Sequence, residues 1–251
     1  SSITDAQGVI VEDAIAKFCG EVAALRAQGH GVVAVTSGAI AAGLPAVGLG
    51  GERRPSDSVT LQAASAIGQS RLMRVYDDRF AELGLVSGQV MLAPLDFGIR
   101  QQYLHARGTL LRLRDLGVVP VVNENDAIAD DEIRFGDNDR LAALVAHLVG
   151  ADVLVLLTDT EGVLTADPRL DDSASLIEEI VEVDHDLERR AGGTGTVRGS
   201  GGMASKLRAA KIAAWSGERA VVAAAHRDGV LADAVAGTSG VGTTVLPQDR
   251  Q

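Results

Sequence analysis

Apolar residues near the start of the chain follow two different periodicities. Between residues 15 and 25 they recur every three or four positions, which is typical of the buried face of a helix, and they are Ile15, Phe18, Val22 and Leu25. The pattern stops at Gly29, a residue common just after helices. A continuous β-branched run follows at residues 32–35 and predicts a strand covered on both faces.

This alternation of helix and strand repeats along the chain. Helical patterns are expected at residues 61–80, 104–113, 141–149 and 203–215. Strand-like runs are expected at residues 86–92, 118–122, 153–157, 220–223 and 243–246. Such alternation predicts an α/β fold with a mostly parallel sheet between helices. We interpret residues 1–251 as one domain, which this length permits.

Three polar or glycine-rich loops follow predicted strands, where open α/β sheets bind their ligands. The first covers residues 36–43 and contains Ser37 and Gly38. Glycine lets the backbone approach a ligand closely, and a helix start favours an anion, so this loop is one candidate for binding a phosphate or carboxylate. An ordinary tight turn from strand to helix is the alternative, and this segment alone does not choose between the two.

The second loop, residues 123–140, is rich in acids and amides. Such side chains can bind an ammonium group, orient basic residues or help to hold Mg²⁺. Because they gather at a strand end and a helix start, we predict ligand contacts for Asp126, Asn138 and Asp139. Capping of the next helix by Asp137 or Asn138 is the alternative. For residues 130–132 we prefer a solvated acidic hairpin.

The third loop, residues 192–202, is rich in glycine and leads into the helix expected from Met203. A loop of this kind presents several N–H donors to phosphate oxygens, and Lys206 adds a positive charge one turn into the helix. Glycine does not immediately precede this lysine, so the segment is not a Walker A motif. We interpret it as a phosphate-binding loop, with a disordered surface loop as the alternative.

Charge and composition exclude several classes of protein. Acidic residues outnumber basic ones 34 to 23, which gives a net charge of −11, and aromatic residues make up only 3% of the chain. An acidic field repels nucleic acid, and single strands need aromatic stacking platforms, so we expect no nucleic-acid partner. No apolar stretch reaches the roughly 20 residues that span a bilayer. We therefore expect a cytoplasmic protein without a membrane partner.

Residues suited to metal or redox chemistry are sparse. Cys19 is the only cysteine, and it lies on the apolar stripe between Ile15 and Val22. We interpret it as a packing residue rather than a nucleophile. The five histidines are scattered without the spacing of zinc ligands, so we expect no metal bound by protein side chains alone.

Several segments, taken in order, resemble the glutamate 5-kinases, or γ-glutamyl kinases, of the amino-acid kinase family. They are residues 35–43, 62–69, 121–126, 135–139, 157–169 and 200–206. The resemblance covers nearly the whole chain. The order and spacing of these segments separate this branch from the acetylglutamate, aspartate, carbamate and uridylate kinases.

This resemblance implies a three-layer αβα sandwich with a mostly parallel central sheet. It implies transfer of the γ-phosphoryl group of ATP, as its Mg²⁺ complex, to the side-chain carboxylate of L-glutamate, the first step of proline biosynthesis. Proline would act as a feedback inhibitor, and the protein would be a cytoplasmic homo-oligomer.

The resemblance also implies roles for individual residues. Lys206 would be catalytic by neutralising charge on the transferred phosphoryl group, and Asp139 by orienting that lysine. Glutamate would be bound by Ser37, Gly38, Asp126, Asp137 and Asn138. The nucleotide would be bound by Thr158, Asp159, Ser200, Gly201, Gly202, Met203, Ala204, Ser205 and Lys206. We expect the two groups to converge in one shared cleft that contains Asp126 and Lys206, so that the acceptor carboxylate faces the terminal phosphate of the nucleotide.

The chain departs from the family pattern in three places. Relatives begin with a strand that carries Lys-x-Gly-Thr, whereas this chain opens at Ser1, so we expect the first strand and one catalytic cation to be absent. Many relatives also carry a C-terminal PUA domain, which we do not expect before Gln251. The usual Gly-Thr-Gly-Gly-Met has serine at position 200, which keeps a hydroxyl.

Loss of a cation from the transition state predicts that this chain binds its ligands poorly and turns over slowly, whereas a longer parent that carries the lysine is active. Two other functions stay open. The first is a related amino-acid kinase with another acceptor, such as acetylglutamate. The second is a non-catalytic sensor that binds an amino acid or a nucleotide.

Overall fold

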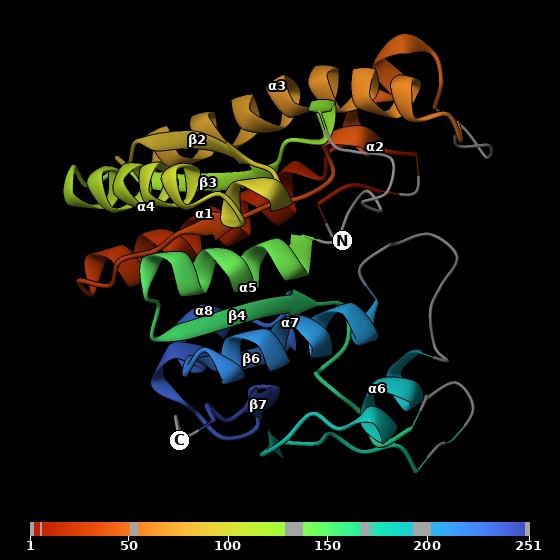
Figure 1. Ribbon diagram of the computed structural model, residues 1–251, viewed down its shortest axis with the longest axis vertical. Coiled ribbons are helices and arrows are strands. Elements are labelled where there is room, and N and C mark those ends of the chain that lie inside the picture. The colour runs from red at the N-terminus through yellow and green to blue at the C-terminus, as the bar shows by residue number, and fades with distance from the viewer. Residues whose placement is uncertain are drawn as a thin grey trace. The chain divides into compact units, whose positions relative to one another are not determined.

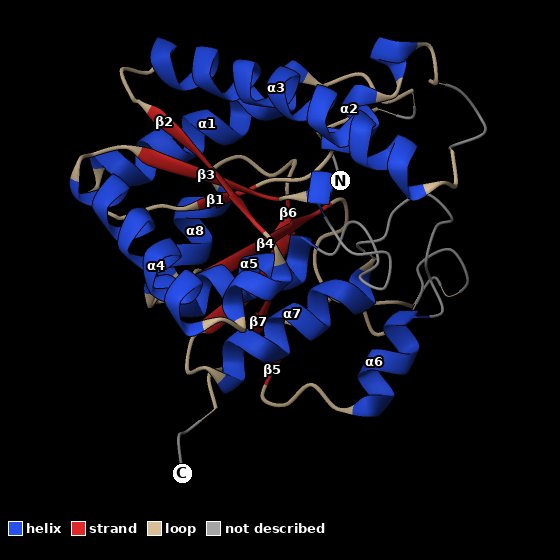
Figure 2. Ribbon diagram, turned by 45° about the horizontal axis from the view of Figure 1, so that its top comes forward, coloured by secondary structure: helices blue, strands red, loops and turns tan. Residues whose placement is uncertain are grey.

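The computed structural model describes residues 3–5, 7–50, 55–128, 138–166, 171, 173–192 and 202–248. The chain divides into two compact units, unit 1 (Ser1–Phe135) and unit 2 (Gly136–Gln251). Both units combine helices with mostly parallel strands (Figures 1 and 2). The predicted α/β class is therefore confirmed, and the single-domain interpretation stays a prediction.

Unit 1 contains a parallel three-stranded sheet in the order β1-β3-β2. Its strands are β1 (Ala34–Val35), β2 (Ser87–Leu92) and β3 (Val119–Glu124). Its helices are α1 (Glu12–Ala27), α2 (Ala39–Gly43), α3 (Ser58–Glu82) and α4 (Arg100–Asp115), with short 3-10 helices η1 (Pro45–Val47), η2 (Pro94–Phe97) and η3 (Asp126–Ile128). The central strand β3 is buried along its whole length, which explains the apolar run of its residues 119–122.

Helix α1 buries the apolar stripe that its sequence predicts. Ile15, Cys19 and Val22 are all 0% exposed. Burial raises the pKa of the Cys19 thiol to about 12, so the group stays protonated at neutral pH. A protonated, buried thiol is a poor nucleophile, and Cys19 is a packing residue, as predicted.

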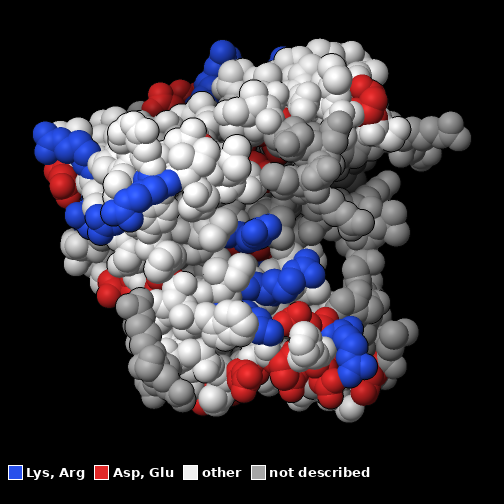
Figure 3. Space-filling view, viewed as in Figure 1, with Lys and Arg blue, Asp and Glu red and all other residues white. Residues whose placement is uncertain are grey.

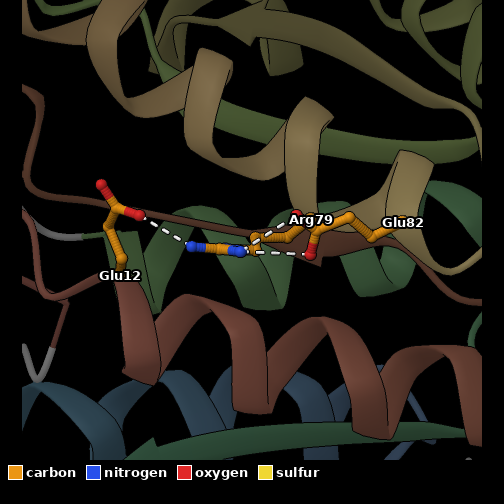
Figure 4. A network of polar contacts seen from close by, with 3 residues as sticks. All are labelled: Glu12, Arg79 and Glu82. Atoms are coloured by element: carbon orange, nitrogen blue, oxygen red, sulfur yellow. Dashed lines mark hydrogen bonds and ion pairs between the residues drawn. The ribbon is translucent and has the colours of Figure 1, made fainter.

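An arginine links α1 to the neighbouring helix α3 (Figure 4). Arg79 Nη2 donates to Glu12 Oε2 at 2.8 Å, and Nη1 donates to both carboxylate oxygens of Glu82 at 3.1 Å. The hydrogen bonds that Arg79 donates to Glu82 and then to Glu12 raise the pKa of its guanidinium group. Because these groups are partly exposed, the network adds little to stability, and the buried apolar stripe dominates the packing.

Helices α2 and α3 cross with their backbones in contact. A Cβ atom on Gly43 would lie 1.8 Å from the carbonyl oxygen of Ala64, and one on Gly68 would lie 1.7 Å from that of Ala39. No side chain fits either gap, so glycine is required at both positions. Next to the crossing, Ile40, Leu44, Leu61 and Ala64 form a buried cluster. The crossing fixes the loop before α2 relative to α3.

Unit 2 contains a four-stranded sheet in the order β4-β6-β7-β5. Its strands are β4 (Val153–Thr158), β5 (Glu179–Ile180), β6 (Arg219–Ala224) and β7 (Thr243–Val245). Its helices are α5 (Asn138–Val149), α6 (His185–Gly192), α7 (Met203–Trp215) and α8 (Val230–Ala236). Strand β4 pairs with β6 in parallel, whereas β6 and β7 run antiparallel. Helices α5 and α7 pack against each other and against β4.

The long helices and the β-branched strands lie where the sequence predicts them. Besides the short 3-10 helices, four described elements are not predicted: the α-helices α2, α6 and α8 and the strand β5. They are short, and a helix of five or seven residues or a strand of two shows too few positions for a periodicity to be recognised. Among the described residues, no helix is long and apolar enough to cross a membrane.

Candidate functional site

In unit 1, the candidate residues follow two neighbouring parallel strands. Ala34 of β1 faces Val121 of β3, and the amide of Thr36 donates to the carbonyl of Val122 at 2.9 Å. Parallel strands end at the same edge of a sheet. Ser37 and Gly38, which follow β1, are therefore brought to the same edge as Asp126, which begins η3 directly after β3. We call Thr36, Ser37, Gly38, Asn123 and Asp126 the strand-end cluster.

Gly38 has a structural reason to be glycine. Its φ of 95° lies in the left-handed region, where residues with a Cβ are strained, and it is the N-cap of α2. The turn requirement explains this residue without any ligand. Its contact with glutamate therefore stays a prediction.

Asp126 is a buried carboxylate at the end of β3. It is 7% exposed, and its Oδ2 accepts a hydrogen bond from Ser65 Oγ of α3 at 3.2 Å. Nearby, Asn123 Nδ2 donates to Gln69 Oε1 at 2.7 Å, while Asn123 Oδ1 accepts from the Glu124 amide. Buried charges are kept when a partner compensates their desolvation, so this position suits a cationic ligand group such as an ammonium.

In unit 2, Lys206 and Asp139 form an ion pair between two helix starts. Lys206 lies in the first turn of α7, Asp139 lies in the first turn of α5, and the lysine Nζ is 2.9 Å from the aspartate Oδ1. The two side chains are 12% and 14% exposed. Within the described residues, Asp139 Oδ2 is buried without a hydrogen-bond partner. The pair thus holds the ammonium group at one oxygen and leaves its remaining protons for another acceptor.

The start of α7 also offers backbone donors. Gly202 is the N-cap in an extended conformation, and no side chain of the described residues caps this end. Met203 and Ala204 are half-buried in the first turn, and Ser205 is buried. First-turn N–H groups and the helix dipole favour an anion, and a lysine on the same turn adds charge. This end of α7 therefore fits a phosphate group.

Two further predicted residues end strand β4. Thr158 is buried and donates from Oγ1 to Asp159 Oδ1 at 3.2 Å, while Asp159 is exposed. Helices α5 and α7 each run back along the parallel strand that follows them, β4 or β6, so their starts lie at the edge where β4 ends. Thr158, Asp159, Asn138, Asp139 and Lys206 therefore share one edge of the unit 2 sheet.

Charged side chains gather on helices α6 and α7 of unit 2. Figure 3 shows basic and acidic side chains close together over α6 and the neighbouring part of α7. Lys211 of α7 contacts both α6 and its own helix: its Nζ lies 2.7 Å from Glu188 Oε1 of α6 and 5.4 Å from the centre of the Trp215 ring. Helix α7 is thus tied to α5 through Lys206 and to α6 through Lys211.

The structure groups the predicted residues by unit. Ser37, Gly38 and Asp126 gather in unit 1, while Asn138, Asp139, Thr158, Asp159 and residues 202–206 gather in unit 2. Asp137, Ser200 and Gly201 lie outside the described residues. The approach of Asp126 to Lys206 stays a prediction. Sequence reasoning assigned no role to Ser65 and Gln69, although both lie in the segment 62–69 that carries the family resemblance, because polar residues on a helix read as a solvent-exposed face.

A comparison of the sequence with models of protein families identifies the family of this chain. The model of the "Amino acid kinase family" matches residues 1–224. The chain belongs to the amino acid kinase family.

Curated relatives are similar over most of the chain. A glutamate 5-kinase from Paraburkholderia xenovorans is 48% identical over 233 residues, which is 93% of this chain and 62% of the relative. A glutamate 5-kinase from Pelobacter propionicus is 45% identical over 247 residues, or 98% of this chain and 65% of the relative. The chain thus spans less than two thirds of the length of these relatives.

Solved structures show the same fold at low sequence identity. Isopentenyl phosphate kinase from T. acidophilum has a TM-score of 0.62 and 19% identity, and covers 97% of this chain and 95% of its own. Carbamate kinase from Giardia lamblia bound to AMP-PNP has a TM-score of 0.63 and 17% identity, and covers 94% and 90%. These two proteins are different kinases, so the fold does not determine the phosphoryl acceptor.

Proposed function

We propose that this protein is a glutamate 5-kinase, which transfers the γ-phosphoryl group of ATP to the side-chain carboxylate of L-glutamate. The observation that carries the proposal is 45% and 48% identity to two glutamate 5-kinases over 98% and 93% of the chain. The Lys206–Asp139 pair supports it, because phosphoryl transfer depends on a positioned cation more than on covalent chemistry. In this role the protein serves proline biosynthesis, with proline as a feedback inhibitor of a homo-oligomeric cytoplasmic enzyme.

The described residues of unit 2 have distinct roles in this reaction. The first-turn amides of α7 bind phosphate oxygens, and Lys206 neutralises the charge that grows on the transferred group. Asp139 holds the lysine ammonium from one side and so directs its other protons toward the phosphate. Magnesium suits this edge because it prefers oxygen ligands and arrives with the phosphates of ATP, and Asp159 offers it an exposed carboxylate.

The described residues of unit 1 bind the acceptor. Asp126 pairs with the ammonium group of glutamate, and Ser37 and Gly38 offer polar groups at the same sheet edge. A side-chain carboxylate is already ionised at neutral pH, so the attacking oxygen needs no general base. This explains why neither a histidine nor the buried Cys19 is required.

An acceptor panel tests the proposal. The purified chain is incubated with MgATP, hydroxylamine and one of glutamate, N-acetylglutamate, aspartate or carbamate, and hydroxamate and ADP are measured. We expect glutamate to give the highest rate, and reactions without ATP or without acceptor to give none. A faster reaction with N-acetylglutamate would assign another acceptor. Calorimetric binding of glutamate or ATP without any ADP formation would instead identify a sensor.

A further inference from the structure

Helix α3 buries a stripe of polar side chains in unit 1. Ser65, Gln69 and Tyr76 are 1%, 6% and 3% exposed, and their spacing of four and seven positions places them on one face of the helix. We call these three residues the α3 stripe. An apolar face would pack at lower cost, because every buried polar group must recover its lost hydration through a hydrogen bond.

Each residue of the α3 stripe bonds to a different member of the strand-end cluster. Ser65 donates to Asp126 at 3.2 Å, Gln69 accepts from Asn123 at 2.7 Å, and the hydroxyls of Tyr76 and Thr36 lie 2.9 Å apart. Burial raises the pKa of Tyr76 to about 12, so its hydroxyl keeps its proton. One helix therefore contacts the ends of both β1 and β3.

The stripe is not a closed structural network. Within the described part of the chain, Gln69 Nε2 is buried and has no hydrogen-bond partner. Networks that only stabilise a fold rarely leave a buried donor unused. The same helix also meets α2 at the glycine crossing, where Ala64, the neighbour of Ser65, faces Gly43. Helix α3 thus links the Ser37–Gly38 loop to Asp126.

Ser65 is the residue of the stripe that touches a charged group. The last torsion of an aspartate is broad, so a buried carboxylate adopts one orientation only when a donor holds one of its oxygens. The Ser65 hydroxyl supplies that donor at Asp126 Oδ2. A bond to a charged acceptor is also stronger than a neutral one, which makes the orientation more rigid.

We infer that Ser65 is a positioning residue for glutamate binding: it holds the Asp126 carboxylate in the orientation that receives the substrate's ammonium group. This inference rests on the proposed function, because it takes Asp126 as the partner of that ammonium. Ser65 does not touch the substrate itself. Its contribution is to the affinity for the amino acid and not to the phosphoryl-transfer step.

The test compares three variants of the chain in the ATP- and glutamate-dependent assay. Ser65→Ala removes the donor, and we expect the KM for glutamate to rise about tenfold, in the range of one hydrogen bond to a charged group. The KM for ATP and kcat should change less than about twofold. Ser65→Cys keeps a weak donor and should give an intermediate KM for glutamate.

Ser70→Ala is the matched control. Ser70 is an exposed residue of α3 whose hydroxyl donates to the carbonyl of Ile67 in its own helix, and its loss should leave every kinetic constant unchanged. Thermal unfolding followed by circular dichroism checks that each variant folds. If Ser65→Ala does not fold, Ser65→Cys against the wild type makes the same comparison.

The possible outcomes separate the two proposals. An unchanged glutamate KM in folded Ser65→Ala and Ser65→Cys would overturn the inference and leave the proposed function intact. Equal rises in the KM values for glutamate and ATP would also overturn it, because they would indicate a general loss of structure. A wild-type chain that phosphorylates another acceptor of the panel faster than glutamate would refute the proposed function, and the role of Ser65 with it.

Discussion

In unit 1, neutral side chains on α3 hold the candidate residues, whereas in unit 2 charged side chains hold helix α7. Ser65 and Gln69 reach buried strand-end residues through hydrogen bonds. Lys206 and Lys211 instead pair with Asp139 of α5 and Glu188 of α6 at 2.9 and 2.7 Å. The first arrangement is buried, and the second is partly exposed.

This difference matches the chemistry proposed for each unit. A neutral donor orients a carboxylate without cancelling its charge, which suits the ammonium contact that we propose for Asp126. An ion pair holds a lysine in place while its other protons stay available to an anion. Partly exposed ion pairs are also weakened by salt, whereas buried hydrogen bonds are not. The two units should therefore respond differently to mutation and to ionic strength.

The largest expected effect comes from removing the cation of unit 2. Lys206→Ala should lower kcat by about a hundredfold to a thousandfold, as loss of one preorganised charge stabiliser commonly does. The KM for glutamate should change much less, because the lysine acts on the phosphoryl group. Steady-state kinetics with varied glutamate and ATP measure both effects. Arg208→Ala, an exposed charge on the same helix, is the control.

This prediction tests whether phosphoryl transfer depends on unit 2 while glutamate binding depends on unit 1. A Lys206→Ala variant with normal kcat and a raised glutamate KM would contradict the assignment. The lysine would then belong with acceptor binding, which we ascribe to unit 1.

The next effect concerns the crossing that supports the α3 stripe. Gly68→Ala places a Cβ atom 1.7 Å from the carbonyl oxygen of Ala39, so α2 and α3 must separate. We expect the free energy of unfolding to fall by about 1–3 kcal/mol, as overpacking commonly costs. Urea denaturation followed by circular dichroism measures it.

Gly108→Ala is a control for which we expect the free energy of unfolding to rise instead of fall. Gly108 lies on an exposed face of α4, and a Cβ atom there meets nothing within 4 Å. Alanine in a helix should therefore stabilise the protein by about 0.5–1 kcal/mol. If Gly68→Ala were as stable as Gly108→Ala, the backbone contact between α2 and α3 would be refuted.

The smallest effect concerns the second ion pair of unit 2. Lys211→Met removes the contacts with Glu188 and Trp215, and we expect it to lower the free energy of unfolding by about 0.5–1 kcal/mol at low salt. The difference from the wild type should shrink at high salt. Fluorescence of Trp215, the single tryptophan of the chain, follows unfolding in urea.

Lys17→Met is the matched control for this pair. Lys17 pairs with Glu21 on its own helix in unit 1, so its loss should leave the fluorescence of Trp215 in the folded protein unchanged. Equal urea midpoints for Lys211→Met and the wild type at low salt would mean that the ion pair does not tie α6 to α7.

Sequence patterns predicted the long helices and most strands well, because burial of an element produces a recognisable spacing of its apolar residues. Strand β3 is buried throughout, and its residues 119–122 read as a continuous apolar run. Helix α1 buries every third or fourth residue. Helix α8 is missed, although Gly229 and Gly237 bound it and their left-handed φ angles suit helix ends. The periodicity of a strand does not show whether it runs parallel or antiparallel to its neighbour. The antiparallel pairing of β6 with β7 is therefore visible only in the folded sheet.

The candidate site divides in the same manner. Lys206, Asp139 and Asp126 were predicted because charged residues at strand ends and helix starts stand out against apolar neighbours. Ser65 and Gln69 lie in the segment 62–69 that carries the family resemblance, but their contacts could not be predicted. A polar residue within a helix looks the same in sequence whether it faces water or a strand end.

The sequence by itself determined the α/β class, the family and the residues with charges suited to phosphate and ammonium groups, because local periodicity and residue type carry that information. Only the tertiary structure decided which of these residues meet: Lys206 with Asp139 across 67 positions, and Ser65 with Asp126 across 61. Contacts between residues far apart in the chain depend on how helices pack on strands. That packing is a property of the whole fold and not of any one segment.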